Sequence, residues 1–141
     1  MCIRDSVIEH SDPTLIPLSV TVETSLRRVY LDALRESGTV GQLLAQQAEA
    51  FAVDEQNEAK FGETCEGLPN DMINFLHDPL ACAIALGWNE GVELEELPLV
   101  LEVKDSWLYE RIDPSGKPIR LVTKIDGTRF NEFWFNKITN R

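Results

Sequence analysis

The sequence is poor in basic residues, and no cluster of them stands out. Its 141 residues hold 13 lysines and arginines against 24 aspartates and glutamates, which gives a formal net charge of −11. Proteins that bind nucleic acid neutralise phosphates with clustered basic side chains. The nearest approach to such a cluster is the pair Arg27-Arg28, which we interpret as part of a solvated helix face. The composition therefore predicts no nucleic-acid partner.

Cysteines are also few, and long apolar runs are absent. The three cysteines, Cys2, Cys65 and Cys82, cannot all pair within one chain, and none forms a C-x-x-C motif. No run approaches the ~20 apolar residues that cross a bilayer, and no signal segment is recognisable. These absences predict no membrane partner and a reducing, cytoplasmic location. Cys82 lies in an apolar stretch, where we expect a small buried core residue.

The length and the 43% hydrophobic content allow one domain with a core. We expect one domain over 13–141, preceded by a poorly defined segment over 1–12. Within that segment, we expect either that Met1–Ser6 is not native or that the natural start lies upstream. Periodicity and turn signals predict the following elements. They are a buried strand at 14–20, a helix opening at 21–24 and ending at Gly38, a helix at 39–51 with a polar extension to 60, a loop at 62–74, a helix at 79–86, a glutamate-rich turn at 90–96, strands at 99–103, 107–109 and 121–125, and a helix at 128–139.

This order of strands and helices predicts a mixed α/β fold. The turn signal at 113–116 predicts a hairpin between the last two strands. In the helix that starts at Thr39, we expect Val40, Leu43, Leu44, Ala48 and Phe51 to form the inner stripe.

The five residues His77-Asp78-Pro79-Leu80-Ala81 are the most informative motif. Asp78 before Pro79 predicts a helix start, with Asp78 as N-cap and proline at the first helical position. The helix that follows is nearly all apolar, so we expect it to be buried. His77 then lies at the mouth of that helix. On the residues alone, a capping role for Asp78 and a structural role for His77 remain open.

The motif resembles, residue for residue, the late active-site motif of the inosine-uridine-preferring nucleoside hydrolases. Weaker similarities occur in order around it. The segment 15–21 resembles a strand of that family, and Ile125-Asp126 with Arg129-Phe130 resembles its closing strand and helix. The resemblance runs from about Pro13 to Ile138 and implies the C-terminal part of a nucleoside-hydrolase-type α/β fold, with a mostly parallel sheet flanked by helices.

The resemblance implies an activity and site residues. Family members hydrolyse the N-glycosidic bond of ribonucleosides, which gives ribose and free base, and they depend on calcium. Carried over, His77 is the catalytic residue that helps the base to leave, and Asp78 is a calcium ligand. A ribonucleoside is then the substrate, and the full-length parent is expected to be a homo-oligomer. Asn70, Asn74 and Phe75 are candidates for substrate binding, with turn chemistry for the asparagines and core packing for Phe75 as alternatives.

The implied chemistry agrees with the residue types. Calcium prefers carboxylate and other hard oxygen ligands, and a bound metal positions the sugar and activates water. An imidazole exchanges protons near neutral pH and suits a departing base.

One departure from the family pattern limits this expectation. The sequence lacks the Asp-x-Asp-x-x-x-Asp-Asp cluster that supplies most of the family's calcium ligands and its base. The calcium site is therefore incomplete in this chain, and we expect the isolated chain to be inactive. The alternative is a non-enzymatic α/β interaction module or a relic fragment, in which the motif is only a capped helix.

Overall fold

The structure is a computed structural model that describes residues 10–54, 68–105 and 107–140. The chain divides into two compact units. The first unit contains residues up to Val20 together with Val92–Ile125, and the second contains Thr21–Gly91 together with the residues from Asp126 onward. Within the described ranges, no helix has the length and apolar character needed to cross a membrane. The predicted polar extension over 55–60, the start of the loop at 62–67 and the segment 1–6 lie outside the described residues.

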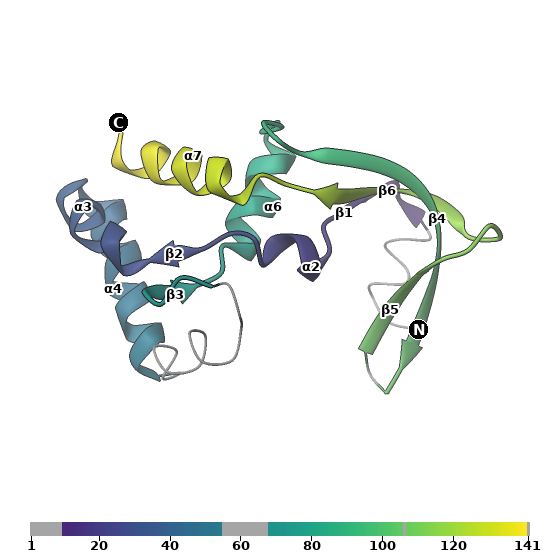
Figure 1. The fold of residues 1–141 in the computed structure, drawn as a ribbon, viewed down its shortest axis with the longest axis horizontal. Helices are drawn as coiled ribbons and strands as arrows, with labels where there is room; N and C mark the ends of the chain where they lie inside the picture. The colour runs from purple at the N-terminus through teal and green to yellow at the C-terminus, as the bar shows by residue number, and fades with distance from the viewer. Residues whose placement is uncertain (1–9, 55–67, 106, 141) are drawn as a thin grey trace. The chain divides into compact units, whose positions relative to one another are not determined.

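The first unit is built around a four-stranded sheet in the order β1-β6-β4-β5 (Figure 1). Strand β1 pairs with β6 in parallel, whereas β4 pairs antiparallel with both β5 and β6. The mixed α/β class is confirmed. The predicted mostly parallel sheet is wrong for the described strands, in which β1–β6 is the one parallel pair. The strands are β1 (Thr14–Leu15), β4 (Glu93–Lys104), β5 (Trp107–Ile112) and β6 (Lys117–Lys124).

The predicted hairpin is misplaced, because β5 and β6 are successive partners of one long strand. Strand β4 pairs with β6 through Glu93–Leu99 and with β5 through Leu99–Lys104. The hairpin turn lies at Asp105, which has a positive φ of 51°. A Cβ placed on Gly116 would lie 2.4 Å from the carbonyl carbon of Leu99. The turn at 113–116 therefore packs against the backbone of β4 instead of forming a hairpin tip.

A local hydrogen-bond group fixes this turn. The Asp113 carboxylate accepts bonds from the backbone N–H and the hydroxyl of Ser115, at 2.9 and 2.6 Å. These bonds, together with the Arg111 guanidinium, lower the pKa of Asp113 to about 2. The turn chemistry that marks this segment in the sequence is thus present.

Leu99 and Ile119 form a buried cluster in the first unit, with leucines packed around them. The glutamates expected in a turn at 90–96 belong in part to strand β4, which begins at Glu93. Glu93, Glu95 and Glu96 are exposed, as expected of a solvated face.

The second unit combines helices with a short antiparallel pair of strands, β2 and β3 (Figure 1). Helix α4 confirms the helix predicted from Thr39, and helix α7 confirms the helix predicted over 128–139. The elements are β2 (Leu26–Arg27), the 3-10 helix η1 (Arg28–Tyr30), α3 (Leu31–Glu36), α4 (Thr39–Asp54), β3 (Met72–Asn74), α6 (His77–Ala85) and α7 (Gly127–Thr139). Helix α2 (Leu18–Thr21) spans the boundary between the units.

Three predicted boundaries are wrong for physical reasons. The strand at 14–20 stops after Leu15, because Pro17 precedes a turn in which the Val20 N–H donates to the Pro17 carbonyl at 3.0 Å. The helix predicted from 21–24 begins at Leu31, because residues 26–27 extend and pair with β3. Residues 72–74, predicted as loop, form β3 for the same reason.

Helix α4 packs through its small residues. Gly41, Ala45, Ala48 and Ala52 are buried. The predicted inner residues Val40, Leu43 and Phe51 are exposed, so that part of the stripe is wrong. A Cβ on Gly41 would lie 2.2 Å from the Leu34 carbonyl oxygen of α3, and this close approach excludes larger side chains.

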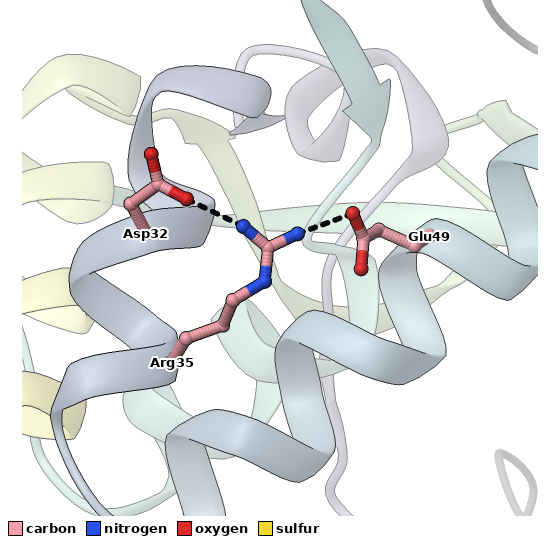
Figure 2. Close-up of polar contacts among 3 residues, drawn as sticks. All are labelled: Asp32, Arg35 and Glu49. Carbon is pink, nitrogen blue, oxygen red and sulfur yellow. Dashed lines mark hydrogen bonds and ion pairs between the residues drawn. The ribbon is translucent and has the colours of Figure 1, made fainter.

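Charged side chains bridge the same two helices. Figure 2 shows Arg35 of α3 between Asp32 of its own helix and Glu49 of α4, and it forms an ion pair with each. These partners are at least two-fifths exposed, and such pairs add little to stability. The packing of small residues therefore decides how α3 and α4 meet.

Helix α6 is not buried as predicted. Leu80 is fully buried, but Cys82 is exposed and Leu86 is 84% exposed. Only part of this apolar helix therefore contributes to the described core, and the prediction of a buried Cys82 is wrong.

Helix α7 is fixed at its start. The Asp126 carboxylate caps it by accepting the Arg129 N–H at 3.0 Å. Phe130 is fully buried and contacts Trp88 edge to face, with ring centroids 5.2 Å apart. A Cβ on Gly127 would lie 2.1 Å from the Glu23 carbonyl oxygen, so the segment before Thr24 crosses α7 at van der Waals distance.

We predict that Gly127→Ala destabilises the protein by about 1–3 kcal/mol, because the added methyl group must displace the backbone at Glu23. Thermal unfolding followed by circular dichroism measures this change. Thr128→Ala, at the exposed next position, is the matched control and should leave the midpoint nearly unchanged. Equal stability of Gly127→Ala and wild type would contradict the close approach.

Candidate functional site

The candidate site lies where β3 leads into α6. His77 is the first residue of α6, and Asn74, Phe75 and Leu76 precede it. The segment Thr21–Ser25 contacts this stretch, although it is about 50 residues away in the sequence. The site is therefore formed by two segments of the second unit.

The His77 imidazole is held on two sides. Its Nδ1 atom lies 2.6 Å from the Thr21 hydroxyl oxygen, and its ring stacks on Phe75 with centroids 5.1 Å apart and an angle of 28° between the planes. When Nδ1 accepts the Thr21 proton, the neutral ring carries its own proton on Nε2. The contact to Thr21 thus fixes the orientation of the ring and leaves Nε2 as the nitrogen for a ligand.

Thr24 links the two segments of the site. Its fully buried hydroxyl donates to the Thr21 carbonyl at 2.8 Å and accepts the backbone N–H of Leu76 at 3.0 Å. Leu76 directly precedes His77. The position of the imidazole therefore depends on a buried hydroxyl that bonds to both neighbouring segments.

The Thr21–Ser25 segment is also anchored to helix α7. The Asn131 side chain accepts the Ser25 N–H at 3.0 Å and donates to the Ser25 hydroxyl oxygen at 3.3 Å. Both bonds involve a part-buried amide. Together with the close approach at Gly127, this amide holds the Thr21–Ser25 segment against α7.

An ion pair anchors the approach to β3. Arg27 Nε lies 2.8 Å from the Asp71 carboxylate, and the Arg28 N–H donates to the Asp71 carbonyl at 2.9 Å. Burial raises the pKa of Asp71, but the hydrogen bond and charge of Arg27 outweigh it and hold the pKa below its ordinary value. Arg27, interpreted from the sequence as part of a solvated face, instead joins β2 to the segment before β3.

The structure separates the predicted substrate-binding residues. Phe75 contacts His77, whereas the Asn74 side chain, at the end of β3, accepts the N–H of Phe75 at 2.8 Å. Asn70 is exposed in the turn before β3. The Asn74 side-chain oxygen is thus engaged by the neighbouring backbone, and a role of Asn74 in substrate binding stays a prediction. Thr21 was missed in the sequence, where nothing marks a contact to a histidine 56 residues away.

Asp78 is not the N-cap. Helix α6 begins at His77, Leu76 occupies the cap position, and no side chain caps the helix. The helix begins two residues earlier than the sequence suggests, because the Leu80 N–H already bonds to the Leu76 carbonyl at 3.0 Å. The Asp78 carboxylate is exposed in the first turn, where the helix dipole favours a negative charge.

Asp78 alone does not fit a calcium ion. Calcium takes about six to eight oxygen ligands. Among the described residues, no three histidine, cysteine, aspartate or glutamate side chains gather where they would hold a metal. The carboxylate is accessible, but the described part of the chain gives it no companion ligands.

Comparisons with known proteins support the fold. The structure is similar to that of a purine-preferring ribonucleoside hydrolase from Gardnerella vaginalis, with a TM-score of 0.68 and 22% sequence identity. The match covers 90% of this chain and 39% of that hydrolase. No protein-family profile matches the sequence, and no curated protein matches it. The chain therefore has the α/β fold of part of a nucleoside hydrolase.

We predict that Thr24→Val weakens the site and costs about 1–3 kcal/mol in unfolding free energy, because the buried Leu76 N–H loses its acceptor. Hydrogen exchange of the Leu76 amide, measured by NMR, should become faster. Thr24→Ser keeps the hydroxyl and is the matched control, for which this amide should stay protected. Unchanged exchange in Thr24→Val would show that the bond does not hold the segment.

Proposed function

We propose that this chain contributes to hydrolysis of the N-glycosidic bond of ribonucleosides, and that it provides the part of the site that receives the base. The observation that carries the proposal is the His77 imidazole, held by Thr21 and stacked on Phe75 at the start of α6. The likeness in fold to a ribonucleoside hydrolase supports the reaction class. An inosine-uridine preference rests on the sequence resemblance.

The residues of the site suit the departing base. Cleavage of the bond places negative charge on the base, and a proton on His77 Nε2 offsets this charge. The Thr21 hydroxyl positions the ring, and Phe75 supports its face. His77 is the proposed catalytic residue, Thr21 is a positioning residue, and Phe75 is the proposed aromatic contact.

The part of the reaction that activates water needs other groups. It requires a general base and a bound metal, and the described residues bring no group of three or more histidine, cysteine, aspartate or glutamate side chains together to hold one. We propose that Asp78 is one ligand of a calcium ion whose other ligands lie outside the described residues. The isolated chain is accordingly expected to bind nucleosides without hydrolysing them at a measurable rate.

Binding at His77 is tested directly by NMR. The chain has two histidines, so His10→Gln leaves His77 as the single imidazole. We predict that inosine shifts the ring resonances of His77 in a saturable manner, whereas ribose shifts them much less, because the base meets the ring. Phe75→Ala should weaken inosine binding about tenfold, from the loss of aromatic contact worth about 1 kcal/mol or more.

Two outcomes would contradict this assignment. One is a His77 resonance that inosine leaves unchanged while the protein is folded. The other is release of base from inosine by the isolated chain in calcium at a rate that His77→Ala leaves intact. Release that His77→Ala abolishes would confirm the catalytic residue but overturn the expectation that the isolated chain is inactive.

A second candidate is a non-enzymatic interaction module. The exposed apolar face of α6 and the lack of companion ligands for Asp78 among the described residues favour it. Metal dependence distinguishes the two candidates, because the module has no need of calcium.

We predict that calcium at high concentration raises the melting temperature and that Asp78→Ala removes the rise, because a ligand that binds the folded state stabilises it. Differential scanning fluorimetry with calcium and magnesium measures the effect. Asp32→Ala, which removes an exposed acid of another first turn, is the matched control. A rise that persists in Asp78→Ala would contradict a role for Asp78 as ligand.

A further inference from the structure

Helix α7 meets the Thr21–Ser25 segment at two places on one face of the helix. At the first place, a Cβ on Gly127 would lie 2.1 Å from the Glu23 carbonyl oxygen. At the second, the Asn131 side chain bonds to Ser25. Gly127 and Asn131 are four residues apart, so they lie on the same side of the helix, about one turn from each other. The glycine lets the two backbones approach closely, and the asparagine adds a specific polar contact.

The Asn131 amide uses both of its polar atoms on a single residue. Its oxygen accepts the Ser25 N–H at 3.0 Å, and its nitrogen donates to the Ser25 hydroxyl oxygen at 3.3 Å. Ser25 is 8% exposed, and a buried N–H that loses its acceptor destabilises the fold. Two bonds to one residue restrict the direction of the segment more than one bond would.

The anchored segment leads directly to the imidazole. Thr24, next to Ser25, bonds to the Thr21 carbonyl through its hydroxyl at 2.8 Å and through its backbone N–H at 3.1 Å. The Thr21 hydroxyl oxygen in turn lies 2.6 Å from His77 Nδ1. A continuous series of contacts therefore connects α7 to the ring, and all of its members belong to the second unit.

We propose that Asn131 is a positioning residue for His77, and that it acts through the Thr21–Ser25 segment rather than by contact with the ring. This inference rests on the proposed function, because the position of the imidazole matters to the reaction only if His77 meets the base. Without the amide, the segment keeps its bond to Leu76 but loses its polar link to α7. The Thr21 hydroxyl is then expected to move away from Nδ1.

Nuclear Overhauser effects measure this geometry without any ligand. In the full chain with His10→Gln, the His77 ring protons should show a strong effect to the Thr21 methyl group, because ring and side chain are in contact. Asn131→Leu keeps a branched side chain with the same number of heavy atoms but removes both hydrogen bonds. This variant should weaken the effect between His77 and Thr21 several-fold.

The packing of α7 is monitored separately. The rings of Trp88 and Phe130 contact each other edge to face, with centroids 5.2 Å apart, directly before Asn131 in the helix. The effect between these two rings should be unchanged in Asn131→Leu, whereas a general disruption of the helix would weaken it as well. Asn136→Leu makes the same change at an exposed position of α7 and is the matched control, which should leave the effect at His77 unchanged.

A conservative variant tests whether the hydrogen bonds are the cause. Asn131→Asp keeps an acceptor for the Ser25 N–H, and the Ser25 hydroxyl can reverse and donate to the carboxylate. This variant should therefore keep the effect between His77 and Thr21. If Asn131→Leu does not fold, Ser25→Ala removes the hydroxyl but keeps the N–H, and it should weaken the effect to a smaller degree.

Two results would overturn the role of Asn131. One is an unchanged effect at His77 in Asn131→Leu, or in Ser25→Ala where the first variant does not fold. The other is equal weakening of the effects at His77 and at Trp88, which would show that Asn131 serves only the packing of α7. Neither result bears on the proposed function, because no nucleoside is present. Inosine that leaves the His77 resonances of the parent chain unchanged would instead overturn the proposed function, and the effect of Asn131 on the ring would still be measured.

Discussion

The buried hydroxyl of Thr24 is the interaction on which the candidate site depends. It bonds both to the Thr21 carbonyl and to the Leu76 N–H. It therefore joins the segment of Thr21, whose hydroxyl contacts the imidazole, to the segment that contains His77. A hydroxyl with no exposed surface must satisfy both of its bonding capacities within the protein. The distance between Thr21 and His77 is therefore set from inside the unit, and the ring is oriented before any ligand arrives.

Close backbone approach provides the second constraint. Gly127 lets the chain before Thr24 cross α7, and Gly41 lets α4 lie against α3. At both places a methyl group would overlap a carbonyl oxygen of the neighbouring segment. These contacts fix backbone positions more sharply than the exposed ion pairs of Arg35 do, because dense packing resists displacement whereas surface charges are screened. The amide of Asn131 then fixes the direction of the segment that Gly127 allows to approach.

The sequence predicted the α/β class and helices α4 and α7, which the structure confirms, whereas the role of His77 stays a prediction. Prediction failed where tertiary contacts outweigh local pattern. Leu26 and Arg27 fit a helix by periodicity but extend to pair with β3. Large apolar residues suggested the inner face of α4, yet the small residues face the core because α3 lies so close. The contact of Thr21 could not be predicted for a different reason. A hydrogen bond between a hydroxyl and a histidine 56 residues later produces no periodic pattern in the sequence.

The proposed reaction has two parts, departure of the base and activation of water, and they need different groups. In the proposed reaction, the described groups, an imidazole with an aromatic support and a positioning hydroxyl, are assigned to the leaving base. Activation of water requires carboxylates and a metal, and these need several oxygen atoms that converge on one point. Asp78, exposed in the first turn of α6, offers one such oxygen donor beside His77. Because the two halves of the proposed reaction use different groups, the contacts of Thr24 and Asn131 can hold the proposed base-binding half in place without the other half, and its binding is measurable independently of turnover.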